Sequence, residues 1–263
     1  MNSGDDLILI GGAPRSGTTL LRAIIGASSN IFCGPELRVI PSLCTLRDNI
    51  AGASGDALSK GYGVSAAQLD AATANTVSAF LTPATKNAGA TRVAEKTPTN
   101  ALHFSTLRRL FPKAYLISIV RDGRDVVSSL LQMNWRDERT GQRMPATTCP
   151  RSAAALWAAS VANDNKMIGD ERFYSLRYED LVRSPAAEIA KLFAFLGEPT
   201  PNLALYHDRA FDALEGENEA SAARVAEPID TTAIGRWRKE LADEQLASVT
   251  AAAGPWLEHY GYV

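Results

Sequence analysis

A glycine-rich stretch near the start of the chain has the residue types and spacing of a phosphate-binding loop. Residues 12–17 are Gly-Ala-Pro-Arg-Ser-Gly, which fits the nucleoside-triphosphate loop, but Thr18 stands where that loop carries its lysine and Thr19 follows. In nucleoside triphosphatases the lysine reaches the β and γ phosphates and the next Ser or Thr holds magnesium. A loop without it is expected to hold a less charged anion that needs no metal, such as a phosphosulfate, with Arg15 as the local cation.

The elements around this loop favour the same interpretation. The apolar run Leu7–Ile10 predicts a buried strand, and residues 18–25 have the apolar spacing of a helix. The loop therefore joins a strand end to a helix start, where unpaired backbone N–H groups and the helix dipole favour an anion.

A second strand-to-helix junction offers another anion site. Residues 114–120, AYLISIV, form a continuous apolar run that suits a strand buried on both faces; Arg121 ends it, and Ser129 lies two turns into the following helix. The guanidinium of Arg121 and the hydroxyl of Ser129 can grip one phosphate. Alternatively, the arginines and aspartates of RDGRD pair with one another on a solvated helix start. Together, the two junctions fit a ligand with two separated anionic ends.

Strand and helix patterns alternate along the chain. This predicts an α/β fold, a three-layer sandwich with a mostly parallel central sheet, whose ligands bind beyond the carboxyl ends of the strands. Besides the segments above, the expected strands are 91–95 and 173–176, and the expected helices are 36–50 (interrupted or kinked by Pro41), 66–81, 104–110, a helix ending near 133, 151–167, one ended by Gly197, and one near the C-terminus.

Composition sets limits on the class of protein. The 263 residues are 46% apolar and 21% charged with net charge −2, which suits one globular domain spanning 1–263 and argues against a nucleic-acid-binding protein. No apolar stretch approaches a membrane span, and the polar start predicts neither signal peptide nor anchor. Three widely spaced cysteines give no disulfide framework or metal pattern, so a reducing cytoplasm is expected.

Several motifs, in order, resemble those of sulfotransferases that use 3′-phosphoadenosine 5′-phosphosulfate (PAPS). The closest likeness is to the tyrosylprotein sulfotransferases, and it implies the P-loop sulfotransferase fold and 3′,5′-adenosine bisphosphate (PAP) as product. The motifs are GGAPRSGTTLLRA, CGPELRVIP, EKTPTN, RLFPKAYLISIVRDGRDVVSS, RYEDLV and, near the end, AIGRWRKEL.

The resemblance implies roles for individual residues. Glu36 would be the general base, Lys96 and Arg15 the cations acting on the transferring group, and Arg38 an acceptor contact. Arg121 and Ser129 would hold the 3′-phosphate and Tyr178 would lie by the nucleotide. The remaining donor-binding positions are in the first loop, which supplies Pro14, Arg15, Ser16, Gly17, Thr18 and Thr19. No metal is implied.

Sulfuryl transfer requires these residue types for chemical reasons that do not depend on the resemblance. Sulfuryl transfer resembles phosphoryl transfer, so cations are needed at the bridging oxygen and a carboxylate can take the acceptor proton. None of the three histidines lies in a motif, which favours a glutamate base. Individually, Glu36 could instead be a first-turn helix acid, Lys96 a solvated turn residue and Tyr178 a packing residue.

The chain departs from the family pattern at three points. Pro35 replaces an acidic residue that family members with protein acceptors carry. In the stretch that covers the nucleotide, Glu227 stands where the family has a lysine, and Arg224 could supply the missing positive charge. The membrane anchor and secretory context of the animal enzymes are also lacking. This last difference favours a bacterial cytoplasmic enzyme that does not contact membranes.

Fold alone does not identify the acceptor. As the acceptor, a tyrosyl peptide or another phenol is the preferred interpretation, and a carbohydrate or natural-product hydroxyl comes next. Two alternatives come from other classes of protein: a P-loop kinase or nucleotide hydrolase, and a catalytically inert nucleotide-binding protein. Specificity is expected in the segments after Pro35, in 135–149 and in 209–232, the last expected to be a mobile acidic loop. The aromatic C-terminal tail can dock on its own domain or on a partner, and a homodimer is left open.

Overall fold

The centre of the molecule is a five-stranded sheet, all of whose strands run parallel. The computed structural model describes residues 7–137, 139–202, 225 and 227–263, without the side chains of 85–88. The strands are β1 (Leu7–Gly11), β2 (Ile31–Cys33), β3 (Arg92–Lys96), β4 (Tyr115–Val120) and β5 (Phe173–Arg177), and the sheet order is β2-β3-β1-β4-β5. Because β1 pairs with both β3 and β4, the glycine-rich loop lies between the two strand ends that carry Lys96 and Arg121.

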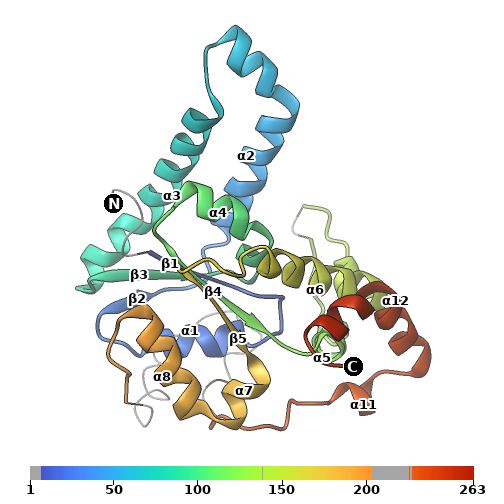
Figure 1. Cartoon of the computed structure of the whole chain (residues 1–263). Coiled ribbons are helices and arrows are strands. Elements are labelled where there is room, and N and C mark those ends of the chain that lie inside the picture. Colours follow the sequence, from blue (N-terminus) through green and yellow to red (C-terminus); the bar gives the residue numbers. More distant parts are fainter. Residues whose placement is uncertain (1–6, 138, 203–224, 226) are drawn as a thin grey trace.

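Helices cover both faces of this sheet, so the predicted three-layer α/β fold is confirmed (Figure 1). The helices are α1 (Thr18–Gly26), α2 (Val39–Asp56), α3 (Ala66–Ala88), α4 (Phe104–Leu110), α5 (Gly123–Leu131), α6 (Pro150–Asn165), α7 (Tyr178–Arg183), α8 (Pro185–Leu196), α11 (Trp237–Glu240) and α12 (Asp243–His259), with short turns η1 (Ala57–Gly61), η2 (Pro98–His103) and η3 (Pro145–Thr147).

Side-chain alternation along the strands creates two apolar layers. Ile8 and Ile10 of β1 face α1, α7 and α8, whereas Leu7 and Leu9 face α2, α3 and α4. A third apolar cluster joins α5, α6 and α12 beside the end of β4, around the fully buried Trp157. This cluster fixes α5 against the sheet, and α5 carries Ser129.

Two local differences from the sequence-based expectation concern the segment before α2. The short edge strand β2 was not predicted. The helix expected from residue 36 begins only at Val39, so Glu36 is not a first-turn helix acid, and Arg38 adopts a left-handed conformation with φ 53°. Pro41 lies in the first turn, where backbone N–H groups have no helical partner, and therefore does not interrupt α2.

The aromatic C-terminal tail docks on its own domain. The Tyr262 hydroxyl donates to Glu179 at 3.0 Å, and the Arg177 guanidinium lies 4.6 Å from the centre of the Tyr262 ring. Arg124 donates to the Tyr262 carbonyl at 2.5 Å. None of the helices described here combines the length and the hydropathy that a membrane span needs.

Candidate active site

Two glycines of the glycine-rich loop occupy positions where a side chain would not fit. Gly17 precedes α1 with φ 101°, and a Cβ there would lie 2.7 Å from the Tyr178 ring; Gly12 has φ 148°, and its Cβ would lie 2.6 Å from the Ile119 carbonyl oxygen. No side chain caps α1 and its first turn holds no acidic residue. The positive end of the helix dipole therefore faces the loop without a protein carboxylate against it, which suits an anionic ligand.

Arg121 reaches this loop from the end of β4. Its guanidinium donates to the carbonyl oxygens of Arg15 at 3.1 Å and Ala233 at 2.5 Å, and lies 4.8 Å from the centre of the Tyr178 ring. Its carboxylate neighbour Asp125 is 3.8 Å away. Arg124 pairs with Asp122 at 2.8 Å, so the arginines and aspartates of RDGRD do pair, but Arg121 is only 6% and Arg124 9% exposed, so the pairs are not solvated.

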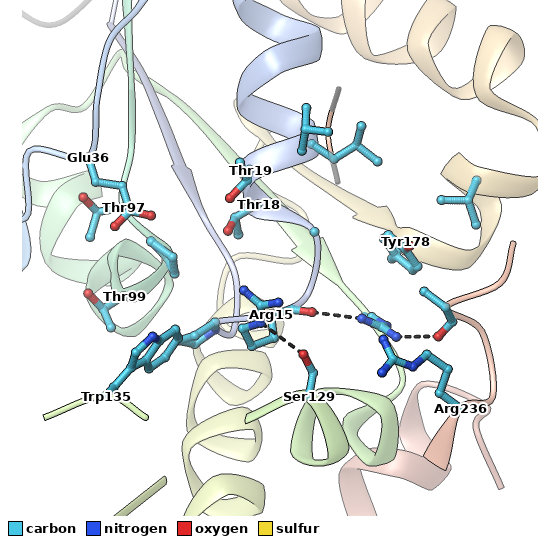
Figure 2. Close-up of a pocket in the computed structure, with 18 of the residues that line it drawn as sticks. Arg15, Thr18, Thr19, Glu36, Thr97, Thr99, Ser129, Trp135, Tyr178 and Arg236 are labelled. Atoms are coloured by element: carbon cyan, nitrogen blue, oxygen red, sulfur yellow. Dashed lines mark hydrogen bonds between the residues drawn. The ribbon is translucent and has the colours of Figure 1, made fainter. Parts of the chain in front are cut away.

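Arg15 and Ser129 join the two predicted anion sites. Arg15 Nε donates to Ser129 Oγ at 3.0 Å across 114 sequence positions (Figure 2). Burial lowers the pKa of Arg15, and the charges of Arg121 and Arg236 lower it further. An anion bound beside Arg15 would oppose both effects.

These residues line one cavity of about 1100 Å³. Figure 2 shows Glu36, Thr97, Thr99 and Trp135 at one end, Arg15 and Ser129 in the middle, and Tyr178 and Arg236 at the other end. Of the predicted site residues, the cavity is lined by Pro14, Arg15, Gly17, Thr18, Thr19, Glu36, Arg38, Arg121, Ser129 and Tyr178. Ser16 and Lys96 are fully buried and do not line it.

Lys96 lies behind the cavity lining and contacts Glu36, which does line the cavity. Its ammonium lies 2.5 Å from Glu36 Oε1, and Arg38 Nε lies 3.2 Å from Glu36 Oε2. The Lys96 side chain is 0% exposed, so the alternative of a solvated turn lysine is wrong. The Arg38 side chain is 67% exposed, which makes its pair with Glu36 weak in water. Glu36 therefore has one firmly held oxygen and one loosely held oxygen.

Sequence reasoning missed part of the cavity wall. Arg236 lines it beside Ser129, and its guanidinium pairs with Glu240 at 2.6 Å. Trp135 and Met144 line the Glu36 end together with Thr97, Pro98, Thr99 and Arg136. The motif AIGRWRKEL pointed to the segment that contains Arg236, but residue types alone did not show which of its cations faces inward.

The segment expected to cover the nucleotide is described only in part. Glu227 and residues 228–233 are described, and several of them line the cavity; Arg224 and most of the expected 209–232 loop lie outside the described residues. The Arg224 prediction therefore stays a prediction.

Comparison with known proteins supports the family. The model of the sulfotransferase family matches residues 7–202. A putative protein-tyrosine sulfotransferase of Caenorhabditis briggsae is 30% identical over 100% of this chain and 91% of its own length, and protein-tyrosine sulfotransferase A of Caenorhabditis elegans is 28% identical over 99% and 68%.

Solved structures share the fold at low identity. The sulfotransferase domain of the Synechococcus PCC 7002 olefin synthase has a TM-score of 0.64 at 21% identity over 96% of both chains. Mouse sulfotransferase SULT7A1, complexed with PAP, has a TM-score of 0.57 at 14% identity over 94% of this chain and 83% of its own. The predicted sulfotransferase fold is confirmed.

The predicted source and localisation are wrong. The expected bacterial cytoplasmic enzyme is contradicted by the curated relatives, which include nematode, fly and human protein-tyrosine sulfotransferases. It rested on the polar start of the sequence, the cysteine pattern and the lack of the animal enzymes' membrane anchor, and none of these features reports the organism or the compartment. The kinase alternative is excluded as well, because the chain belongs to the sulfotransferase family, the PAPS-dependent enzymes that transfer a sulfuryl group to a hydroxyl acceptor.

Proposed function

We propose that this enzyme sulfates a phenolic hydroxyl, with the tyrosyl side chain of a peptide as the acceptor class and Glu36 as the general base. The observation that carries the proposal is that Glu36, whose carboxylate lies 2.5 Å from the buried Lys96 ammonium, lines the same cavity as the glycine-rich loop and Arg15. The names of the curated relatives support a tyrosyl acceptor.

The nucleotide end of the cavity fits a donor with two anionic groups. The glycine-rich loop and the start of α1 would hold the phosphosulfate, and Arg121 with Ser129 would hold the 3′-phosphate, beside the Tyr178 ring. The lowered pKa of Arg15 beside Arg121 and Arg236 supports this assignment, because an anion bound there would offset the effect of the two neighbouring charges. When bound, PAPS supplies the sulfuryl group that is transferred.

The Glu36 end of the cavity suits an aromatic acceptor. Trp135, Pro98 and Met144 give it apolar surface, and Arg38 and Arg136 place two guanidinium groups at its edge. An aromatic ring gains from burial against such a wall. The apolar residues therefore favour a phenol as the acceptor.

Glu36 is arranged to accept a proton at one oxygen. Lys96 holds Oε1, and the exposed Arg38 holds Oε2 only weakly. Oε2 is therefore the oxygen that takes the proton of the acceptor hydroxyl. Lys96 keeps the carboxylate in place and, with Arg15, would stabilise the charge that develops during transfer without the help of a metal ion.

The test is a radiolabelled sulfate-transfer assay over a tyrosine peptide, a simple phenol and a sugar. Glu36→Gln should lower kcat by about 10²–10⁴-fold, because positioned proton transfer contributes about that much. Its Kd for PAP should stay within about twofold of wild type. The control is Glu188→Gln, which removes the acid of another Glu–Lys pair, with 2.6 Å to Lys191, on α8.

Undiminished transfer by Glu36→Gln would remove Glu36 from the base role. Transfer to the sugar but not to either phenol would overturn the acceptor class. Tight PAP binding with no transfer to any of the three would instead identify an inert nucleotide-binding protein.

A further inference from the structure

The segment 95–100, EKTPTN, holds more buried polar side chains than its lysine. Besides Lys96, the side chains of Glu95, Thr97 and Asn100 are buried, with exposed fractions of 3%, 4% and 0%. None of these three has a role in the proposed function above. A buried carboxylate is unfavourable unless its oxygens are hydrogen-bonded, so its partners show what it does.

Within the described residues, the Glu95 carboxylate accepts hydrogen bonds from Leu37, Thr97 and Asn100. Its Oε1 accepts from Thr97 Oγ1 at 2.6 Å and from the backbone N–H of Leu37 at 3.2 Å. Its Oε2 accepts from Asn100 Nδ2 at 2.7 Å, and the same amide donates to the Ile10 carbonyl at 3.1 Å. Glu95 thus connects the end of β1 to the segment that carries Glu36.

That segment receives little support from regular structure. Residues 36–38 lie between β2 and α2, and Arg38 has the left-handed backbone that costs a non-glycine residue on the order of 1 kcal/mol. The Arg38 N–H donates to Thr97 Oγ1 at 3.2 Å. The backbone N–H groups of Leu37 and Arg38 are therefore held by side chains of 95–100, not by a helix or a strand.

We propose that Glu95, Thr97 and Asn100 are positioning residues that hold the segment 36–38 so that the Glu36 carboxylate stands against Lys96. Only an acceptor with two oxygens can take three donors from different directions, which is why a carboxylate fits this place. Lys96 follows Glu95 directly, so one strand end fixes both the cation and the acid. This inference rests on the proposed role of Glu36.

The chain offers matched variants at Thr97 and Thr99. Thr97→Val keeps the side-chain shape and removes the hydroxyl that accepts from Arg38, and Thr97→Ser restores that hydroxyl. Thr99→Val is the control, because Thr99 lines the same cavity and its hydroxyl makes no hydrogen bond within the described residues. Glu95→Gln is a second variant, which replaces the oxygen that accepts from Asn100 with a donor.

Two measurements separate this inference from the base assignment. Amide hydrogen exchange of the free enzyme reports the segment directly: exchange at Arg38 should rise about tenfold or more in Thr97→Val and stay at the wild-type rate in Thr97→Ser and Thr99→Val. In the transfer assay, kcat of Thr97→Val should fall on the order of tenfold to a hundredfold, because misplacing a catalytic group by about 1 Å has that effect. Kd for PAP should stay within about twofold.

Unchanged exchange at Leu37 and Arg38 in both Thr97→Val and Glu95→Gln would overturn the inference, whatever Glu36→Gln shows. Faster exchange with undiminished kcat would also overturn it, because the position of the segment would then not matter to turnover. Failure of Glu36→Gln to lower kcat is a different result, which would refute the base role itself.

Discussion

A buried aspartate between α6 and β4 should make the stability of the enzyme depend on pH. Asp164 of α6 is 2% exposed and accepts a hydrogen bond from the Ser118 hydroxyl of β4, and its other oxygen, Oδ1, has no hydrogen-bond partner among the described residues. Burial raises the pKa of Asp164 from 3.8 to about 7, and the Ser118 hydrogen bond only partly opposes this.

The sign and size of the effect follow from that shift. Between pH 3.8 and about 7 the folded protein binds a proton that the unfolded chain has released, so the free energy of unfolding falls as the pH rises. At 1.36 kcal/mol per pH unit, the loss totals about 4 kcal/mol and is complete above about pH 7. Stability from this group is therefore greatest in acid.

Asp164→Asn should remove this slope. The amide cannot ionise, but its N–H₂ is a buried donor without a partner, which costs about 1–3 kcal/mol. The variant should therefore be less stable than wild type near pH 4 and more stable by about 1–3 kcal/mol at pH 8. The assay is urea unfolding followed by circular dichroism at intervals from pH 4 to 9.

The control is Asp56→Asn, which removes a carboxylate whose side chain is 89% exposed and should leave the pH dependence as in wild type. Ser118→Ala should extend the slope to higher pH, because it removes the hydrogen bond that opposes the effect of burial. Parallel stability curves for wild type and Asp164→Asn would refute the reasoning.

Two further substitutions test the nucleotide end of the cavity by calorimetry. Arg236→Ala should weaken PAP binding about tenfold and leave 5′-AMP binding within about twofold, since one charge-assisted contact is worth about 1.5–3 kcal/mol. The control is Arg238→Ala, because the Arg238 guanidinium lies over the Trp237 ring. An equal loss of affinity for both nucleotides would refute a contact between Arg236 and the 3′-phosphate. Gly17→Ala should abolish PAP binding, because its Cβ would lie 2.7 Å from the Tyr178 ring in a backbone with φ 101°. The control is Gly52→Ala, since the space around Gly52 is open. PAP binding at the wild-type level by Gly17→Ala would contradict the assigned loop geometry.

The sequence predicted the parts of the fold that are long and uniformly apolar. β1 and β4 are buried on both faces, so their apolar runs stood out without any alternation. β2 has only three residues, Ile31–Cys33, and a run of that length carries no periodic signal. Helix starts were predicted less well, as the displaced start of α2 at Val39 shows.

Sequence reasoning located the candidate site because ligands of parallel sheets bind where the strands end. It placed Arg15 and Arg121 at two strand ends. The two residues are close together only because β1 lies next to β4, and local sequence patterns do not predict the order of strands in a sheet. The Glu95 network was missed for a related reason. A glutamate within a short strand carries no signal that its partners are a backbone N–H 58 positions earlier and an amide in the next turn.

The segment expected to cover the nucleotide shows what a position-by-position comparison with a family leaves out. Glu227 stands at the family's lysine position, so a position-by-position comparison predicts a lost cation. The potential in a cavity is the sum of the charges around it and does not depend on which position supplies each one. Arg236, from the same part of the chain, lies near enough to Arg15 to lower its pKa, and it lines the same cavity. The chain thus keeps a third guanidinium at the nucleotide end, and Arg236→Ala, not reversal of Glu227, is the substitution that tests whether that charge binds the donor.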